Sequence, residues 1–304
     1  MNSSIRSFCR VLTFSIVLLP ITVVTAYSQT QASCQFKLFK LPQSIASQPN
    51  GISDDGTLVG LAVDLGGGER GFTRSPAGAV TYFSAPNAEP TYRSYTYFTG
   101  RNESGVKVGN YAENKTGAVQ NGFMLSGSSF TSIAFPKTVR ATYANGINKW
   151  NSVVGYYIDS IGNGHAHSFK RFKNGSFITL NYPGAEQTFA TGINDGGAIV
   201  GYYFSGARSS GFLYLNKQWA TLNDPQGTAT ALYGISNAGV IIGRSNRTKQ
   251  GAALLYENGS FKEISVPNSF STYAYGISPD GLITGRTNLD NTATGWRGFT
   301  AACR

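Results

Sequence analysis

Residues 188–203 read TFATGINDGGAIVGYY, and a stretch of this kind occurs six times along the 304-residue chain. Each copy has a short run before a glycine, then a turn rich in small polar residues, then an apolar run. Asn, Asp and Gly in such a turn supply the positive φ angles that tight hairpins require. The repeated glycines that open the turns are Gly51, Gly100, Gly146, Gly192, Gly234 and Gly276. This spacing of about 45 residues indicates one unit repeated along the chain.

Two more apolar runs follow the hairpin in each unit. In the fourth unit they are SGFLYL, which starts at Ser210, and a run in which Trp219 precedes Pro225 by six residues. Each unit therefore contains four short strands, and 37 Gly, 17 Tyr and 19 Phe suit an all-β chain. Four antiparallel strands in each of six units predict a six-bladed β-propeller, with residues 34–304 as one domain.

The two ends of the chain support a closed ring. The last unit stops at GFTAACR and lacks its fourth strand, whereas CQFKLFKLP, which starts at Cys34, resembles a fourth strand without a unit. Pairing the two would complete the last blade and leave no long free edge. Cys34 and Cys303 would then lie where the fourth unit has adjacent turn residues, close enough for a disulfide. Lipidation of Cys34 is the alternative, but Gln31 stands where a lipoprotein signal has an apolar residue.

The repeated pattern GIN-x-x-G-x-IVGYY, followed by F-x-x-I-x-x-P, resembles the extracellular repeats of the HAF family, which are found in exported bacterial proteins. The resemblance covers nearly the whole chain after residue 33. It implies an extracellular, propeller-like protein and no particular reaction. Between these two parts the family pattern has H-A/G-F-LY, and its histidine occurs here only at His167. The other units have Arg70, Asn121, Ser210, Ala252 or Arg297 there. A histidine function shared by all units is therefore not expected.

Residues 1–26 have the features of a secretory signal peptide. Arg6 and Arg10 precede an apolar run that starts at Val11. The run is followed by small residues at Val24-Thr25-Ala26, which favour cleavage. The apolar run is shorter than the roughly 20 residues of a spanning helix, so an uncleaved anchor is the less favoured interpretation. We expect a short flexible segment at 27–33 and a secreted, extracellular or periplasmic protein with no membrane span in its mature form.

The net charge is +10 for the whole chain. The basic residues are scattered, with the densest cluster at Phe169–Lys173, so the charge predicts solubility and no nucleic-acid partner. An anionic polysaccharide or a cell surface is the partner that this charge favours. We expect a monomer.

Candidate chemistry is sparse. The only two histidines, His165 and His167, alternate on one strand. They predict no metal site, because no set of three or four ligands surrounds them in the sequence. The acidic turn residues Asp54, Asp195 and Asp280 lack the alternating oxygen ligands of a Ca²⁺ loop. We therefore predict no cofactor, no metal and no catalytic residue.

A propeller collects the connections between blades and the loops between second and third strands on one face. On that face Tyr and Arg residues, which often anchor interfaces, are the predicted ligand-binding set. The longest inter-blade connection supplies Tyr92, Arg93 and Tyr95. The loops between second and third strands supply Arg70, His165, Arg208, Arg247 and Trp296. Aromatic residues on first strands, such as Tyr143 and Phe189, are expected to pack between blades.

Three functions remain open from the sequence. The favoured one is a secreted, non-enzymatic propeller that binds a carbohydrate or protein on its loop-rich face. The second is an exported hydrolase or lyase that uses His165 or His167. The third is a structural or adhesion module of a cell surface, because a fold does not determine a function.

Overall fold

The computed structural model describes residues 31–86, 95–112, 120–137, 139–160, 164–248, 252–292 and 295–303. The predicted signal peptide, residues 1–26, lies outside this part of the chain. Of the segment predicted to be flexible, residues 31–33 lie against a strand, since the amide of Ala32 donates to the carbonyl of Glu263 at 2.9 Å. The described residues form strands and no helix, so none of them forms a helix that is long and apolar enough to cross a membrane.

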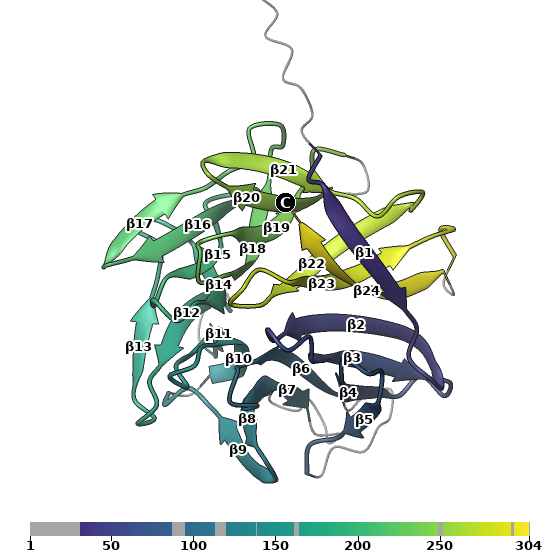
Figure 1. Cartoon of the computed structure of the whole chain (residues 1–304). Helices are drawn as coiled ribbons and strands as arrows, with labels where there is room; N and C mark the ends of the chain where they lie inside the picture. The colour runs from purple at the N-terminus through teal and green to yellow at the C-terminus, as the bar shows by residue number, and fades with distance from the viewer. Residues whose placement is uncertain are drawn as a thin grey trace, which may run out of the picture.

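Each of the first five repeated units forms four strands that pair in sequence order, and the sixth forms three (Figure 1). Units 1 and 2 together form an eight-stranded sheet, in which one parallel pair, Glu69 with Tyr95, joins the two halves. The strands of unit 1 are β2(Ser44–Ile52), β3(Leu58–Asp64), β4(Glu69–Arg74) and β5(Val80–Phe83). Those of unit 2 are β6(Tyr95–Arg101), β7(Lys107–Ala112), β8(Asn121–Ser126) and β9(Ser129–Ile133).

Units 3, 4 and 5 each form a separate four-stranded antiparallel sheet. Unit 3 contains β10(Val139–Ile147), β11(Val153–Asp159), β12(Ala166–Arg171) and β13(Phe177–Leu180). Unit 4 contains β14(Gln187–Ile193), β15(Ile199–Phe204), β16(Ser209–Leu215) and β17(Gln218–Thr221). Unit 5 contains β18(Thr230–Ile235), β19(Ile241–Ser245), β20(Ala252–Glu257) and β21(Ser260–Ile264). The sheets are arranged around a common centre (Figure 1).

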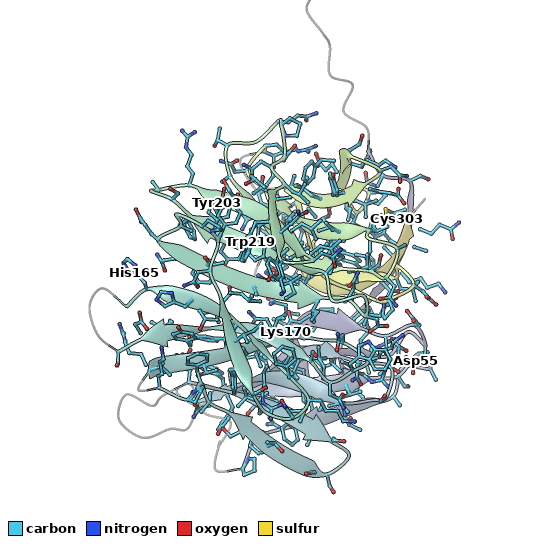
Figure 2. The ribbon with its side chains drawn as sticks, turned by 90° about the vertical axis from the view of Figure 1, so that its left-hand side faces the viewer. Asp55, His165, Lys170, Tyr203, Trp219 and Cys303 are labelled. Atoms are coloured by element: carbon cyan, nitrogen blue, oxygen red, sulfur yellow. A yellow bond between two sulfur atoms is a disulfide. The ribbon has the colours of Figure 1, made fainter. Side chains whose placement is uncertain are left out.

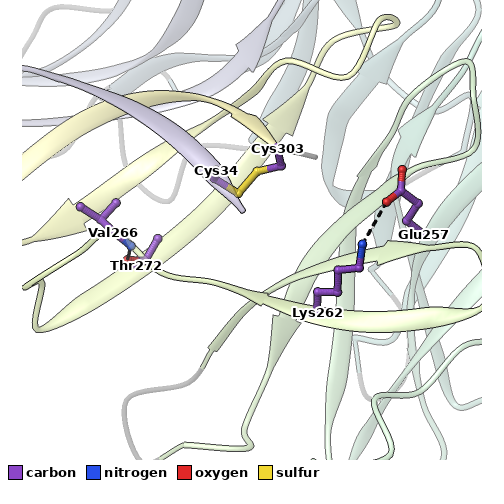
Figure 3. The surroundings of a disulfide bond; sticks show 6 residues. All are labelled: Cys34, Glu257, Lys262, Val266, Thr272 and Cys303. Carbon is purple, nitrogen blue, oxygen red and sulfur yellow. Dashed lines mark hydrogen bonds and ion pairs between the residues drawn. A yellow bond between two sulfur atoms is a disulfide. The ribbon is translucent and has the colours of Figure 1, made fainter. Parts of the chain in front are cut away.

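The predicted closure of the last unit by the first strand is confirmed. Unit 6 contains β22(Ser271–Ile277), β23(Ile283–Asn288) and β24(Trp296–Cys303), and β1(Cys34–Phe39) is its fourth strand. In the register of β1 with β24, Cys34 lies opposite Cys303, and the two form a disulfide with their Cα atoms 4.0 Å apart (Figure 3). The bond therefore joins the edge strand β1 to its neighbour β24 in the same sheet.

Hydrogen bonds between hairpin turns link the last unit to the first. The backbone amide of Asp280 in unit 6 donates to Asp54 Oδ1 in unit 1 at 2.8 Å. The amide of Asp54 in turn donates to Glu103 Oε1 in unit 2 at 3.1 Å. The same type of bond joins units 3 and 4, where the Lys149 amide donates to Asp195 Oδ1 at 2.9 Å. The acidic turn residues therefore act as links between neighbouring units.

The hairpin turns use the conformations that their residues favour. The last glycine of five turns has a positive φ, from 79° to 96°, and Asn151 takes this role at 58° in unit 3. Asparagine tolerates this region better than other residues with a side chain. The members with glycine are Gly56, Gly105, Gly197, Gly239 and Gly281.

A second repeated glycine lets three strands pack closely. A Cβ at Gly201 on β15 would lie 2.0 Å from the Phe189 carbonyl oxygen and 2.8 Å from the Phe212 ring. The third-strand aromatic covers this glycine, and such a ring is fully buried in five units. These rings are Phe72, Phe123, Phe169, Phe212 and Phe299.

We expect Gly201→Ala to lower the free energy of unfolding by about 3 kcal/mol, because the added methyl overlaps backbone that cannot move without breaking strand pairs. Gly196→Ala is the matched control from the same hairpin, since it is exposed and its nearest neighbour is Asn194 Oδ1 at 3.4 Å. Urea unfolding of both variants tests this prediction. Equal stabilities would contradict it.

Candidate functional site

A cavity of about 290 Å³ lies where the innermost strands of all six units meet. The first strand of each unit contributes to its lining. The cavity-lining side chains with hydrogen-bonding groups include five tyrosines and three amides. These are Tyr97, Tyr156, Tyr202, Tyr233, Tyr275, Gln48, Asn50 and Asn145.

A β-bulge places one side chain from each inner strand at the cavity. In every inner strand the pairing shifts by one residue just before the repeated glycine, as between Ala190 and Gly192. A bulge leaves its extra residue unpaired and turns its side chain. Here that residue is Asn50, Thr99, Asn145, Thr191, Tyr233 or Tyr275, and all six line the cavity.

Four of these bulge residues bind the neighbouring unit. Asn50 Nδ2 donates to the Phe98 carbonyl at 2.9 Å, and Thr99 Oγ1 donates to the Ala144 carbonyl at 2.7 Å. Asn145 and Thr191 make the corresponding bonds to the next units at 2.9 and 2.8 Å. Tyr233 and Tyr275 carry rings in this position, with centroids 6.0 Å apart. The cavity wall is thus held by hydrogen bonds in one part and lined by aromatic rings in the other.

Units 3 and 4 contribute a continuous stack of aromatic rings. Tyr143 stacks on Tyr156 at 4.5 Å, Tyr156 meets Phe189 edge-on at 4.9 Å, and Phe189 stacks on Tyr202 at 4.8 Å. The expected packing between units is observed for Phe189, which contacts Tyr156 of the neighbouring sheet, whereas Tyr143 stacks within its own sheet. This stack is called the aromatic wall below.

The tyrosines of the cavity stay neutral at physiological pH. Burial raises the pKa of Tyr97 to about 12, although a hydrogen bond with Asn110 lowers it in part. Burial also raises the pKa values of Tyr156, Tyr202 and Tyr233. It raises the pKa of Tyr275 too, and the nearby charge of Arg286 offsets only part of that effect. Neutral phenols can both donate and accept hydrogen bonds.

Isoleucines narrow the cavity on the side of the hairpin turns. The residue after the repeated glycine is isoleucine in five units and Arg101 in unit 2. Arg101 donates to Ser53 Oγ in unit 1, and its Nη1 lies 3.7 Å from Asp55 Oδ1. The five isoleucines are Ile52, Ile147, Ile193, Ile235 and Ile277. The tyrosines therefore lie toward the opposite side, where the blade connections run.

Arginines replace the aromatic wall in units 5 and 6. Arg244 Cζ lies 5.1 Å from the ring centroid of Tyr273, and Arg286 Cζ lies 5.6 Å from the same ring. Arg286 also lies 4.3 Å from the ring centroid of Trp296. The aromatic faces hold both guanidinium groups by cation–π attraction. We call Arg244, Tyr273, Arg286 and Trp296 the arginine cluster.

The predicted ligand-binding residues do not meet at one point. Tyr92 and Arg93 lie outside the described residues. Tyr95 contacts the cavity residue Tyr97, with ring centroids 5.6 Å apart, and Trp296 belongs to the arginine cluster. Arg208 is exposed on a loop of unit 4. None of the described residues of the predicted set lines the central cavity, and of these residues Tyr95 contacts one that does.

Two predicted arginines already have carboxylate partners. Arg70 Nη2 lies 2.7 Å from Asp64 Oδ2 in a partly exposed pair. Arg247 donates through Nε to Asp224 Oδ2 at 2.7 Å, and both side chains are almost fully buried. Ser245 Oγ donates to the same carboxylate. The Arg247–Asp224 contact thus holds the loop between β19 and β20 against the connection that precedes β18.

Neither histidine lines the cavity. In Figure 2, His165 lies on the side of the molecule opposite the hairpin-turn residue Asp55. His167 Nε2 is 2.7 Å from Asp159 Oδ2, and its Nδ1 is 3.0 Å from Asn181 Nδ2. Both ring nitrogens of His167 are therefore engaged by neighbouring side chains of unit 3. Within the described ranges, no three His, Cys, Asp or Glu side chains are grouped so that they could hold a metal ion.

Sequence reasoning missed the tyrosines that line the cavity and the arginine cluster. The cavity residues Tyr156 and Tyr202 directly follow the second repeated glycine, and Arg244 and Arg286 of the arginine cluster occupy the same position in units 5 and 6. The signal was a variable position within an otherwise regular repeat, with Leu61 and Asn110 in units 1 and 2. The prediction concentrated on loops, whereas the structure places these side chains on strands β11, β15, β19 and β23.

The comparisons with known proteins identify the fold. No known protein family and no curated protein matches the sequence. Among solved structures, virginiamycin B lyase from Staphylococcus aureus aligns over 89% of this chain and all of its own, with 12% identity and a TM-score of 0.51. TolB from Acinetobacter baumannii aligns over 83% of this chain and 65% of its own, with 14% identity and a TM-score of 0.56. Aleuria aurantia lectin aligns over 87% and 97%, with 15% identity and a TM-score of 0.52.

These proteins place the chain in the class of β-propellers. At such low identity the similarity concerns the fold alone, and the three neighbours include an enzyme and a lectin. The HAF resemblance remains a prediction. Any argument for a function has to come from the site itself.

Proposed function

We propose that this chain is an exported, six-bladed β-propeller of the HAF-repeat type that binds a carbohydrate without transforming it. The blade count treats the eight-stranded sheet as two blades, because a single residue pair joins its halves. Export follows from the signal-like residues 1–26 and is supported by the disulfide, which needs an oxidising compartment. The mature chain would be one domain and a monomer.

The observation that carries the proposal is the tyrosine-lined central cavity. Aromatic faces suit the flat apolar faces of sugar rings, and neutral phenols and amides suit sugar hydroxyls. The lining residues come from all six units, so the complete ring is needed to form the site. The same fold holds a sugar in Aleuria aurantia lectin, whose structure contains Fucα1-6GlcNAc.

The enzymatic alternative depends on His165 or His167. Asp159 and Asn181 hold both ring nitrogens of His167, and neither histidine lines the central cavity. A structural or adhesion module would make its contacts through the outer surface of the protein and would not use the cavity. Replacing both histidines by alanine separates these cases, because sugar binding in the cavity should not change.

A glycan array probed with the mature chain, residues 27–304, is the test. We expect selective binding, and we expect Tyr156→Ala and Tyr202→Ala each to weaken it by about tenfold, because each removes a ring face and a hydroxyl. Titration calorimetry with the best glycan of the array measures the loss. Tyr156→Phe and Tyr202→Phe keep the aromatic wall and should weaken glycan binding less than the alanine variants do.

The matched control is Tyr82→Ala. Tyr82 is exposed on the outer strand β5, and its hydroxyl donates to the Pro42 carbonyl at 2.7 Å. Its removal should leave glycan affinity unchanged. A folded chain that binds no glycan would contradict the proposal, as would equal losses in Tyr82→Ala and Tyr202→Ala.

A further inference from the structure

We infer that the ligand of the central cavity carries a carboxylate, as an acidic sugar does, and that Arg244 and Arg286 of the arginine cluster bind it. This inference deepens the proposed function and rests on it. It concerns the side of the cavity formed by units 5 and 6, which differs from the aromatic wall of units 3 and 4.

The first argument is the asymmetry of one repeated position. The residue after the second repeated glycine points toward the centre in units 3 and 4, where Tyr156 and Tyr202 line the cavity. Units 5 and 6 place positive charge at this position instead. Around the ring the residues are Leu61, Asn110, Tyr156, Tyr202, Arg244 and Arg286. Units 5 and 6 therefore carry cationic side chains where the other four units have neutral ones.

The second argument is the direction that Arg244 takes. Its strand partner on β18 is Ala231, whereas units 3 and 4 have Tyr143 and Phe189 opposite their tyrosines. Ala231 offers no ring of unit 5 to Arg244. The Arg244 guanidinium instead reaches Tyr273 of unit 6, which brings it to the same ring as Arg286. Both cations thus face one junction between units.

The third argument is how Arg286 is held. Rings hold its guanidinium, with Trp296 at 4.3 Å, Tyr273 at 5.6 Å and Tyr275 at 5.9 Å. In the described part of the chain no carboxylate forms an ion pair with it, and its buried Nε has no hydrogen-bond partner. A buried donor without a partner costs stability and calls for an explanation. A guanidinium stacked on rings is oriented to meet a carboxylate with two parallel hydrogen bonds.

The neighbouring phenols favour an acidic sugar over a bare anion. Tyr233 and Tyr275 line the cavity beside the arginine cluster, so a ligand that reaches both arginines also meets two neutral hydroxyls and aromatic faces. Residues 1–26 contain two Arg and no acidic residue, so the mature chain has 23 basic and 15 acidic residues, and its net charge of +8 further favours an acidic polysaccharide over a neutral one.

The test compares tri-galacturonate with its methyl ester, which has the same rings without the charge. We expect the mature chain to bind the acid at least about tenfold more tightly at low ionic strength, with a preference that declines as salt is added. Arg286→Gln and Arg244→Gln should each remove most of this preference and leave the affinity for the ester nearly unchanged. Arg286→Lys should keep only part of the preference for the acid, because lysine lacks the planar guanidinium that can donate two parallel hydrogen bonds.

Lys173→Gln is the control for net charge, since Lys173 is exposed on a turn between third and fourth strands and should not change the preference. Unchanged thermal unfolding of the variants excludes misfolding. Equal binding of acid and ester overturns the inference, and so does a sulfated oligosaccharide that binds where galacturonate does not. A third outcome is that neutral glycans bind, that Tyr202→Ala weakens their binding and that the arginine variants do not. That outcome overturns this inference and leaves the proposed function intact.

Discussion

Replacing Cys34 and Cys303 together by serine should lower the free energy of unfolding by about 5 kcal/mol. The bond joins residues 269 positions apart, so in the chain-entropy model its loss frees nearly the whole mature chain in the unfolded state. The folded state loses little else, because β1 keeps its six residue pairs with β24. Guanidinium unfolding of the mature chain measures the effect.

Two measurements separate global from local effects of this change. Reduction of the natural chain should reproduce the loss, since it breaks the same bond without changing the sequence. Trypsin should cut after Lys37 and Lys40 sooner in the variant, because β1 is an outer strand held on one side only. A loss below about 1 kcal/mol would show that native pairing alone closes the ring.

Asp224→Asn should destabilise the protein by about 3–5 kcal/mol at neutral pH. The substitution leaves the Arg247 charge with 2% side-chain exposure and no carboxylate, and an unpaired buried charge is costly. Arg247→Gln in the same chain should recover part of the loss, because the double change removes the charge as well as its partner. The interpretation would be contradicted if the double variant lost as much stability as Asp224→Asn alone, or as much as the two single variants added together.

The effect of Asp224 should depend on pH with a defined sign. Burial alone would raise the pKa of Asp224, but hydrogen bonds from Arg247 and Ser245 outweigh it, so the pKa lies below its ordinary value. Its stabilisation is therefore fully present above the unfolded value of roughly 4 and is lost as the pH falls through the folded pKa. The difference between natural chain and Asp224→Asn, measured by urea unfolding, should shrink only in that acidic range.

Asp64→Asn is the matched control for the buried pair. Asp64 and Arg70 form an ion pair whose side chains are 27% and 38% exposed, and solvent screens such pairs. We expect a loss of about 1 kcal/mol or less at neutral pH. A loss as large as that of Asp224→Asn would mean that burial does not explain the difference.

The repeat pattern predicted the arrangement of strands because its information is local. Alternating apolar residues, turn residues such as Gly197 and Asn151, and the unpaired strand at Cys34 each depend on near neighbours. Closure and the disulfide followed from counting strands. The prediction of the site was weaker, because it assumed that loops carry the ligand-binding residues. Arg70 and Arg247 instead have carboxylate partners, and the cavity is formed by strand residues.

By itself, the amino-acid sequence determined the four-stranded unit and the meeting of the two termini, since both depend on periodicity and turn chemistry. Only the tertiary structure decided which side chains share the centre. Tyr97, Tyr156 and Tyr202 belong to three different units and meet because each inner strand packs closely against the next through a bulge and a glycine. The position of those side chains depends on the angle between sheets, which no short stretch of sequence encodes.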